Sequence, residues 1–92
     1  DLLDYAMGIV RATREDDRVR VGVSPRGAIG LLRAARAYAL VDGRDYLAPD
    51  DIRRLVEPCL AHRIIPVGGS VQGYEGVRVI MEDILDDVHA PL

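Results

Sequence analysis

A serine followed by a proline marks the start of the longest helix that this sequence predicts. Ser24 is a preferred N-cap residue, and Pro25 suits the first helical position, where its missing N–H has no helical partner to lose. Gly43 suits the position just after a helix, so we expect this helix to run from Pro25 to about Asp42. Arg26 then lies in the first turn, beside backbone N–H groups that have no partner within the helix.

A cation in this first turn is unfavourable for the helix, because the N-terminus of a helix already carries about half a positive charge. The arrangement is understandable if an anion such as phosphate binds both the guanidinium group of Arg26 and the free N–H groups. A solvated arginine after a good cap is the alternative interpretation. The pentapeptide from Gly22 to Arg26 does not by itself decide between the two.

Apolar residues recur at helical spacing in three further segments. They predict a first helix over residues 2–14, a third helix that starts near Pro49 and a last helix that includes residues 77–88. Ala48 stands at the cap position of the third helix without a side-chain acceptor, so that end should fray. A chain of 92 residues is long enough for one small domain, and the predicted fold is an all-α bundle of about four helices over residues 1–92.

Proline and glycine predict where this bundle is interrupted. Pro58 should split the third helix into Asp50–Val56 and a short turn through His62, because proline cannot donate the helical hydrogen bond. Residues 19–21 and 63–67 are expected to be extended. A flexible loop should precede the last helix, because glycine recurs there at positions 68, 69, 73 and 76.

The second helix should turn one side toward the bundle core and the other toward a partner. The core side is apolar and consists of Ala28, Leu31, Leu32, Ala35, Tyr38 and Ala39. The other side carries small, apolar and arginine residues, where a helix exposed to water would normally show Glu, Lys and Gln. We name it the outer stripe, and it comprises Arg26, Gly30, Arg33 and Ala37, flanked by Ile29, Arg36, Leu40 and Val41. A surface of this kind suggests that another body covers it, and a helix buried on all sides is the alternative.

The charged residues restrict the function further. All twelve basic residues are arginine, and the P-loop of an ATPase needs a lysine, so this chain alone should not hydrolyse ATP. Residues 11–36 contain seven arginines and three acidic residues, a local charge of +4, whereas residues 47–92 contain four arginines and eight acidic residues, a local charge of −4. We expect the basic part to face phosphate, and solvated helix faces of mixed sign are the alternative.

Several short motifs along the chain resemble one family when they are taken in order. They are Gly22-x-Ser24-Pro25-Arg26 followed by Leu31–Ala37, then Gly43–Tyr46, Pro49–Ile52 and Leu60-x-His62-Arg63. In this order and spacing the chain resembles the C-terminal helical lid of MoxR-type AAA+ ATPases, well over residues 1–65 and loosely thereafter. The resemblance implies that Arg26 is the sensor 2 arginine, which contacts the terminal phosphates of ATP. Arg26 is thus the residue expected to serve both catalysis and cofactor binding.

The resemblance also implies properties of a larger protein. The chain begins at Asp1 within a helical pattern, so we expect it to be a piece of a longer ATPase whose core domain binds ATP and Mg²⁺. No cofactor is expected on this chain alone. The family forms rings, usually hexamers, in which the lid contacts its own core and neighbouring subunits and couples ATP hydrolysis to subunit motion. The resemblance further implies a chaperone-like role and partners with a von Willebrand factor A domain. Whether Arg26 would act in its own or a neighbouring subunit stays open.

Other features of the sequence bear on alternative functions. A stand-alone helical interaction module would explain the bundle but not the Ser-Pro-Arg motif. A lid of the magnesium-chelatase-like AAA+ branch is a second alternative, because such lids share the Asp-Asp-Ile and His-Arg features. A net charge of −3 without an aromatic–basic stripe argues against nucleic-acid binding. His62, His89 and Cys59 lack compact ligand spacing, so no metal site is expected, and His62-Arg63 is interpreted as favourable charge at a helix end. The single cysteine and the lack of a membrane-length apolar run favour a cytoplasmic protein without a membrane span.

Overall fold

The computed structural model describes residues 2–67 and 73–90, which form a small bundle of helices. The helices are α1 (Leu2–Glu15), α2 (Pro25–Val41), α3 (Pro49–Leu60) and α4 (Gly73–Asp87). A 3₁₀ turn, η1 (Ala61–Arg63), follows α3, and the short strands β1 (Val19–Val21) and β2 (Ile65–Pro66) pair antiparallel. The predicted all-α bundle of about four helices is confirmed, and the two segments expected to be extended contain the two strands.

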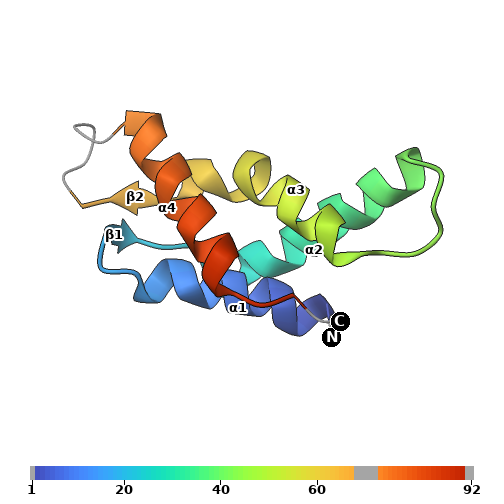
Figure 1. Ribbon diagram of the computed structural model, residues 1–92, viewed down its shortest axis with the longest axis horizontal. Helices are drawn as coiled ribbons and strands as arrows, with labels where there is room; N and C mark the ends of the chain where they lie inside the picture. Colours follow the sequence, from blue (N-terminus) through green and yellow to red (C-terminus); the bar gives the residue numbers. More distant parts are fainter. Residues whose placement is uncertain (1, 68–72, 91–92) are drawn as a thin grey trace.

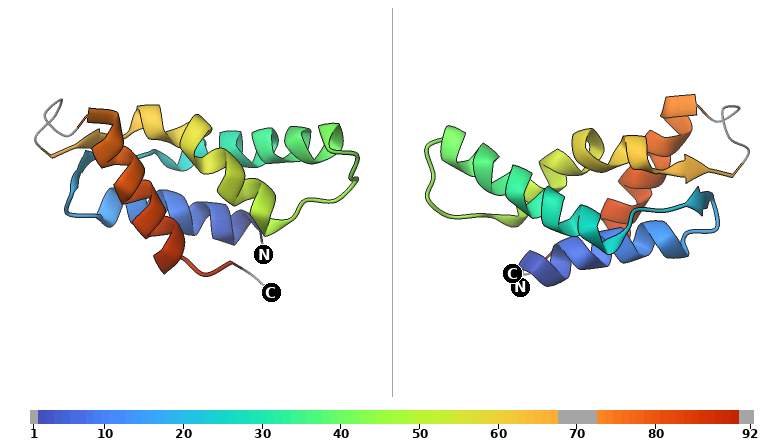
Figure 2. Two further views of the ribbon diagram at one scale, coloured as in Figure 1. Left: turned by 45° about the horizontal axis from the view of Figure 1, so that its top comes forward. Right: turned by 180° about the vertical axis from the view of Figure 1, so that it is seen from behind.

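The bundle is elongated, with extents of 42 × 22 × 21 Å (Figure 1). The helices α2 and α3 run antiparallel as a hairpin, and α4 crosses over α1 on the other side of the core. The C-terminal half of α2 and the loop that follows it project beyond the other helices (Figure 2). None of the helices in the described part of the chain is long and apolar enough to cross a membrane.

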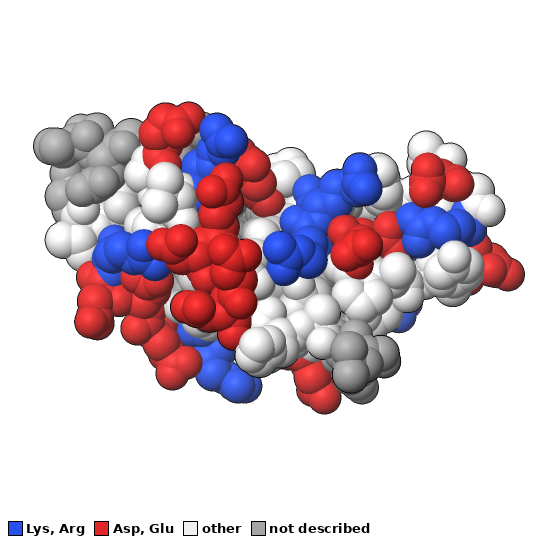
Figure 3. Space-filling model, viewed as in Figure 1, with Lys and Arg blue, Asp and Glu red and all other residues white. Residues whose placement is uncertain are grey.

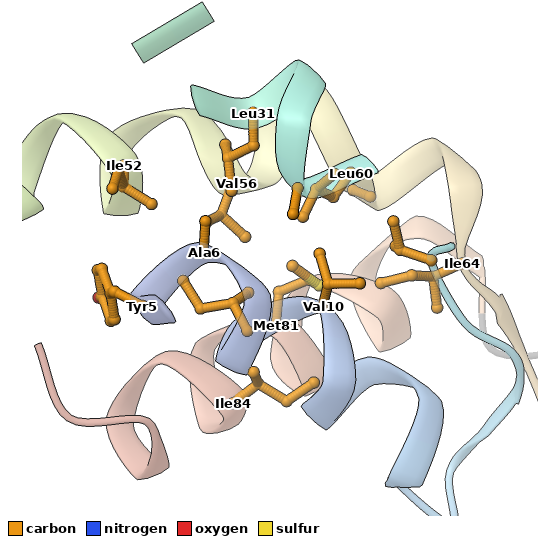
Figure 4. Close-up of a cluster of buried hydrophobic side chains, with 14 of the residues drawn as sticks. Tyr5, Ala6, Val10, Leu31, Ile52, Val56, Leu60, Ile64, Met81 and Ile84 are labelled. Carbon is orange, nitrogen blue, oxygen red and sulfur yellow. The ribbon is translucent and has the colours of Figure 1, made fainter. Parts of the chain in front are cut away.

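One hydrophobic core lies between the four helices (Figure 4). Each helix contributes residues at helical spacing, so that one face of every helix is removed from water. The buried members include Ala6, Ile9 and Val10 of α1, Leu31 of α2, Ile52, Val56 and Leu60 of α3, and Met81 and Ile84 of α4. Leucine, isoleucine, valine, methionine and alanine fill most of the space, together with Tyr5, in a chain that has no Phe or Trp.

Pro58 does not interrupt α3, so the predicted division of this helix is wrong. The helix continues from Pro49 to Leu60, and the 3₁₀ turn begins only after it. Ile52, Val56 and Leu60 share one buried face that extends to both sides of the proline. Packing of this face against the core outweighs the one hydrogen bond that Pro58 cannot donate.

The glycine-rich segment before the last helix is shorter than predicted. Gly73 and Gly76 belong to α4, whereas Gly68 and Gly69 lie outside the described residues. Val77 and Ile80 are buried in the core close to this end of α4. Burial of these side chains outweighs the helix propensity that each glycine costs, which is about 1 kcal/mol.

Candidate functional site

The start of α2 is held against the end of α1 by a close backbone approach at Gly22. A Cβ atom at this position would lie 2.8 Å from the carbonyl oxygen of Thr13 and 2.9 Å from the Cα atom of Arg14, so only glycine fits. The buried hydroxyl of Thr13 accepts the N–H of Val23 at 3.0 Å and donates to the carbonyl of Val10 at 2.6 Å. These contacts place the residues that lead into α2.

Ser24 occupies the N-cap position, as predicted, in an extended conformation. Its side chain makes no capping hydrogen bond, and its carbonyl oxygen accepts the N–H of Gly27 at 2.8 Å. Gly27 packs so closely on Val23 that a Cβ atom would lie 2.2 Å from the Cγ1 atom of the valine. The first turn of α2 is thus fixed in place, and the side chain of Ser24 does not cap it.

Arg26 lies exposed in this first turn and lines a hollow of about 380 Å³ on the outer side of α2. We name it the Gly30 hollow, and its lining residues are Arg26, Ile29, Gly30 and Arg33 of α2 and Arg63 of η1. An adjoining hollow shares Gly30 and Arg63 and continues toward Cys59 and His62. The predicted site residue therefore stands with two further arginines, of which Arg63 comes from a distant part of the sequence.

None of the three arginines around the Gly30 hollow forms an ion pair with a carboxylate among the described residues. Arg18 and Arg44 instead have partners: Arg18 pairs with Asp16 and Asp83, and Arg44 with Asp42 and Asp51. The arginines of α3 and α4 also have partners. Arg53 donates to the carbonyl of Leu85, Arg54 lies over the ring of Tyr38, and Arg78 pairs with Glu75 and Glu82. Arg11, Arg14, Arg20 and Arg36 also form no ion pair among the described residues. What distinguishes the Gly30 hollow is that three unpaired arginines line it together.

Negative charge gathers elsewhere on the molecule. Acidic side chains cover α4 on the face shown in Figure 3, and this helix contributes Glu75, Glu82, Asp83, Asp86 and Asp87. The acidic C-terminal part predicted from the sequence therefore lies largely on α4. The acidic residues of the C-terminal part and the basic residues of α2 thus lie on different helices.

The outer stripe of α2 is exposed along its length, as predicted. The exposed fraction is 50% for Ile29, 68% for Leu40 and 89% for Val41. On the opposite side Leu31 and Ala35 are buried, whereas Leu32, which was also expected in the core, is only partly buried at its edge. The helix is therefore not buried on all sides, and that alternative is excluded for the chain as described.

No sequence pattern indicated that Arg63 belongs to a site, because its closeness to α2 depends on the turn that follows α3. The sequence feature that could have indicated this site was the motif Leu60-x-His62-Arg63, which adds an arginine to the one expected at the start of the second helix. Cys59 beside it is partly buried, and burial raises the pKa of its thiol although the charge of Arg63 opposes this shift. In the part of the chain that the structure describes, no group of His, Cys, Asp and Glu residues could hold a metal ion.

Comparisons with known proteins agree on one family. Residues 11–87 match the model of the AAA lid domain. The uncharacterized protein YeaC of Bacillus subtilis is 41% identical over 91 residues, which are 97% of this chain and 28% of that protein. The chaperone MoxR1 of Mycobacterium tuberculosis is 31% identical over 99 residues, covering 98% of this chain and 26% of that protein.

A solved structure has the same fold. The crystal structure of a candidate ATPase from Cytophaga hutchinsonii superimposes with a TM-score of 0.83 and 34% identity, covering 99% of this chain and 30% of that one. The chain thus spans between a quarter and a third of each of these three relatives. It belongs to the AAA lid domain family and is a lid of the MoxR-like AAA+ type.

Proposed function

We propose that this lid supplies Arg26 to the phosphates of an ATP molecule that the core domain of a longer AAA+ protein holds together with Mg²⁺. The observation that carries the proposal is the placement of Arg26, which is exposed, without an ion pair among the described residues, in the first turn of α2. A guanidinium group beside the N-terminus of a helix offers charge-assisted and backbone hydrogen bonds to one anion. The chain has no lysine for a P-loop, so Arg26 would complete a site built elsewhere.

Phosphoryl transfer gains from such a residue, because negative charge spreads over the oxygens of the transferred group in the transition state. An arginine on a separate domain also links this chemistry to a change in domain position. We extend the proposal to a ring, usually a hexamer, in which the lid couples hydrolysis to motion against its own core and neighbouring subunits. A chaperone-like role, a partner with a von Willebrand factor A domain and a cytoplasmic location belong to the same proposal.

The test is an Arg26→Ala variant of the full-length protein. Loss of one donor to the transition state typically lowers turnover by about 10- to 1000-fold, and we expect a decrease of that size in steady-state ATP hydrolysis. Arg78→Ala is the matched control, because Arg78 is exposed on α4 and pairs only with exposed carboxylates among the described residues. Unchanged turnover and unchanged nucleotide affinity in the Arg26 variant would contradict the proposal.

A protein-interaction role of α2 is the second candidate. It is supported by Leu40 and Val41, which are 68% and 89% exposed at the projecting end of the helix. Within the proposed ring this end would contact the core domain or a neighbouring subunit. If the chain were a stand-alone interaction module, Arg26→Ala would not change ATP turnover. A lid of a magnesium-chelatase-like AAA+ protein is the other alternative, and the Ser-Pro-Arg motif favours the MoxR-like branch.

A further inference from the structure

We propose that Arg63 is a second phosphate-binding arginine. In this proposal, the phosphate chain of the nucleotide lies against the Gly30 hollow. This inference rests on the proposed function of Arg26 and adds to it a residue from a different element. The lid would then hold the phosphates between α2 and η1 rather than touch them with a single side chain.

The first support is the unpaired charge. Arg26, Arg33 and Arg63 line one hollow, and none of them pairs with a carboxylate in the described part of the chain. Like charges that gather in one place repel each other, and an anion that binds between them removes this repulsion. Guanidinium groups bind phosphate oxygens through two parallel hydrogen bonds, which makes arginine well suited to such a ligand.

The second support is the floor of the hollow. A Cβ atom added at Gly30 would meet nothing within 4 Å, so packing inside the chain does not require a glycine here. Glycine is less favourable than alanine in a helix interior. Its lack of a side chain keeps the hollow open down to the helix backbone. Gly30 also lies one turn from both Arg26 and Arg33 on the same face, so a ligand seated on it is within reach of both.

The third support is the position of Arg63. It lies across the hollow from the outer stripe, on the turn that follows α3. It also lines the adjoining hollow beside Gly30. A phosphate group near the start of α2 is therefore flanked by Arg26 on one side and Arg63 on the other.

The first experiment measures binding of a non-hydrolysable ATP analogue to the full-length protein. We expect Arg63→Ala to weaken binding about tenfold or more, a typical loss for one charge-assisted hydrogen bond, and Arg63→Lys to recover part of it. Arg78→Ala should change the dissociation constant less than twofold. If Arg26→Ala weakens binding but Arg63→Ala behaves like Arg78→Ala, this inference is wrong and the proposed function stands. If Arg26→Ala has no effect on binding or turnover, the proposed function fails first.

The second experiment fills the hollow. Gly30→Glu places a carboxylate among the three arginines, and Gly30→Gln adds a side chain of the same size without charge. A phosphate chain must compete with the carboxylate, so we expect the Glu variant to bind the analogue at least tenfold more weakly than the Gln variant. Equal affinities of the two variants, with circular dichroism showing both folded, would overturn the inference. An acidic protein segment as the occupant would give this result, because nucleotide affinity would then not depend on the charge at position 30.

Discussion

Arg44 and Asp51 form a two-pronged ion pair that ties the loop after α2 to the first turn of α3. The Nη1 and Nη2 atoms of Arg44 donate to the two carboxylate oxygens of Asp51 at 2.8 and 2.5 Å. Asp51 is buried and also accepts the backbone N–H of Ala48 at 2.8 Å. The carboxylate therefore covers the N-cap residue from the third helical position, and the predicted weakness of this helix end at Ala48 is not supported.

The pH dependence of stability should report this pair. Hydrogen bonds from Arg44 lower the pKa of Asp51 to about 2, from an ordinary value of 3.8. A lowered carboxyl pKa stabilises the fold above about pH 4, and this contribution is lost as the pH falls toward 2. We expect Asp51→Asn to lower the Tm of the 92-residue chain by roughly 5–15 °C at pH 7. Thermal unfolding followed by circular dichroism should show the difference from wild type shrinking between pH 4 and pH 2.

The control for this prediction is Asp50→Asn, which changes an exposed neighbour in the same helical turn. Asp50 contributes to the favourable charge at the helix start, so its loss should shift the Tm by only a few degrees. An equal shift in both variants would contradict the role of the ion pair. A difference for Asp51→Asn that stays constant down to pH 2 would contradict it as well.

Two glycines of α2 should respond to alanine in opposite directions. Gly30→Ala should raise the free energy of unfolding by up to about 1 kcal/mol, because the Cβ atom enters open space and the helix propensity improves. Gly27→Ala gains the same propensity but places a Cβ atom 2.2 Å from Cγ1 of the buried Val23, which must shift. Urea unfolding of the two variants measures the difference. A change of the same sign at both positions would show that the packing at Val23 is looser than described.

Local signals predicted the fold where the determining contacts are themselves local. The expected end of the second helix at Gly43 is confirmed, since this glycine has a φ of +86° and donates to the carbonyl of Leu40 at 3.0 Å. The predictions at Pro58 and Ala48 failed because the contacts that determine the structure there are not local. The core face of α3 carries the helix past Pro58, and Asp51, held by Arg44, covers the N–H of Ala48. Both depend on residues that are brought together by the tertiary fold.

The candidate site also has one part that the local sequence predicts and one part that depends on the tertiary fold. The exposure of Arg26 follows from its position in the first turn after Ser24 and Pro25, and the sequence predicted it. The placement of Arg63 beside it depends on the path of the whole α2–α3 hairpin and of η1, so no periodicity could indicate it. Hollows formed by two elements are therefore the part of this site that sequence patterns alone could not predict.

Two leucines on opposite sides of α2 should separate stability from assembly. Leu31 is fully buried, and Leu31→Ala should lower the free energy of unfolding by about 2–5 kcal/mol. Leu40 is 68% exposed, so Leu40→Ala should change it by no more than about 0.5 kcal/mol. In the full-length protein, Leu40→Ala should instead weaken subunit assembly or ATP turnover, as measured by sedimentation and steady-state kinetics. Full assembly and activity of this variant would contradict the proposed contact at the projecting end of α2.

The 92-residue chain alone should bind ATP only weakly. Arg26, Arg33 and Arg63 are exposed, so each contact with phosphate replaces a contact with water and contributes little by itself. The chain also lacks the lysine of a P-loop, which would hold the β- and γ-phosphates. We expect a dissociation constant of about 1 mM or weaker in a calorimetric titration with ATP and Mg²⁺. Micromolar binding would mean that the lid holds a complete nucleotide site, and Arg26 would then not need a core domain to act on ATP.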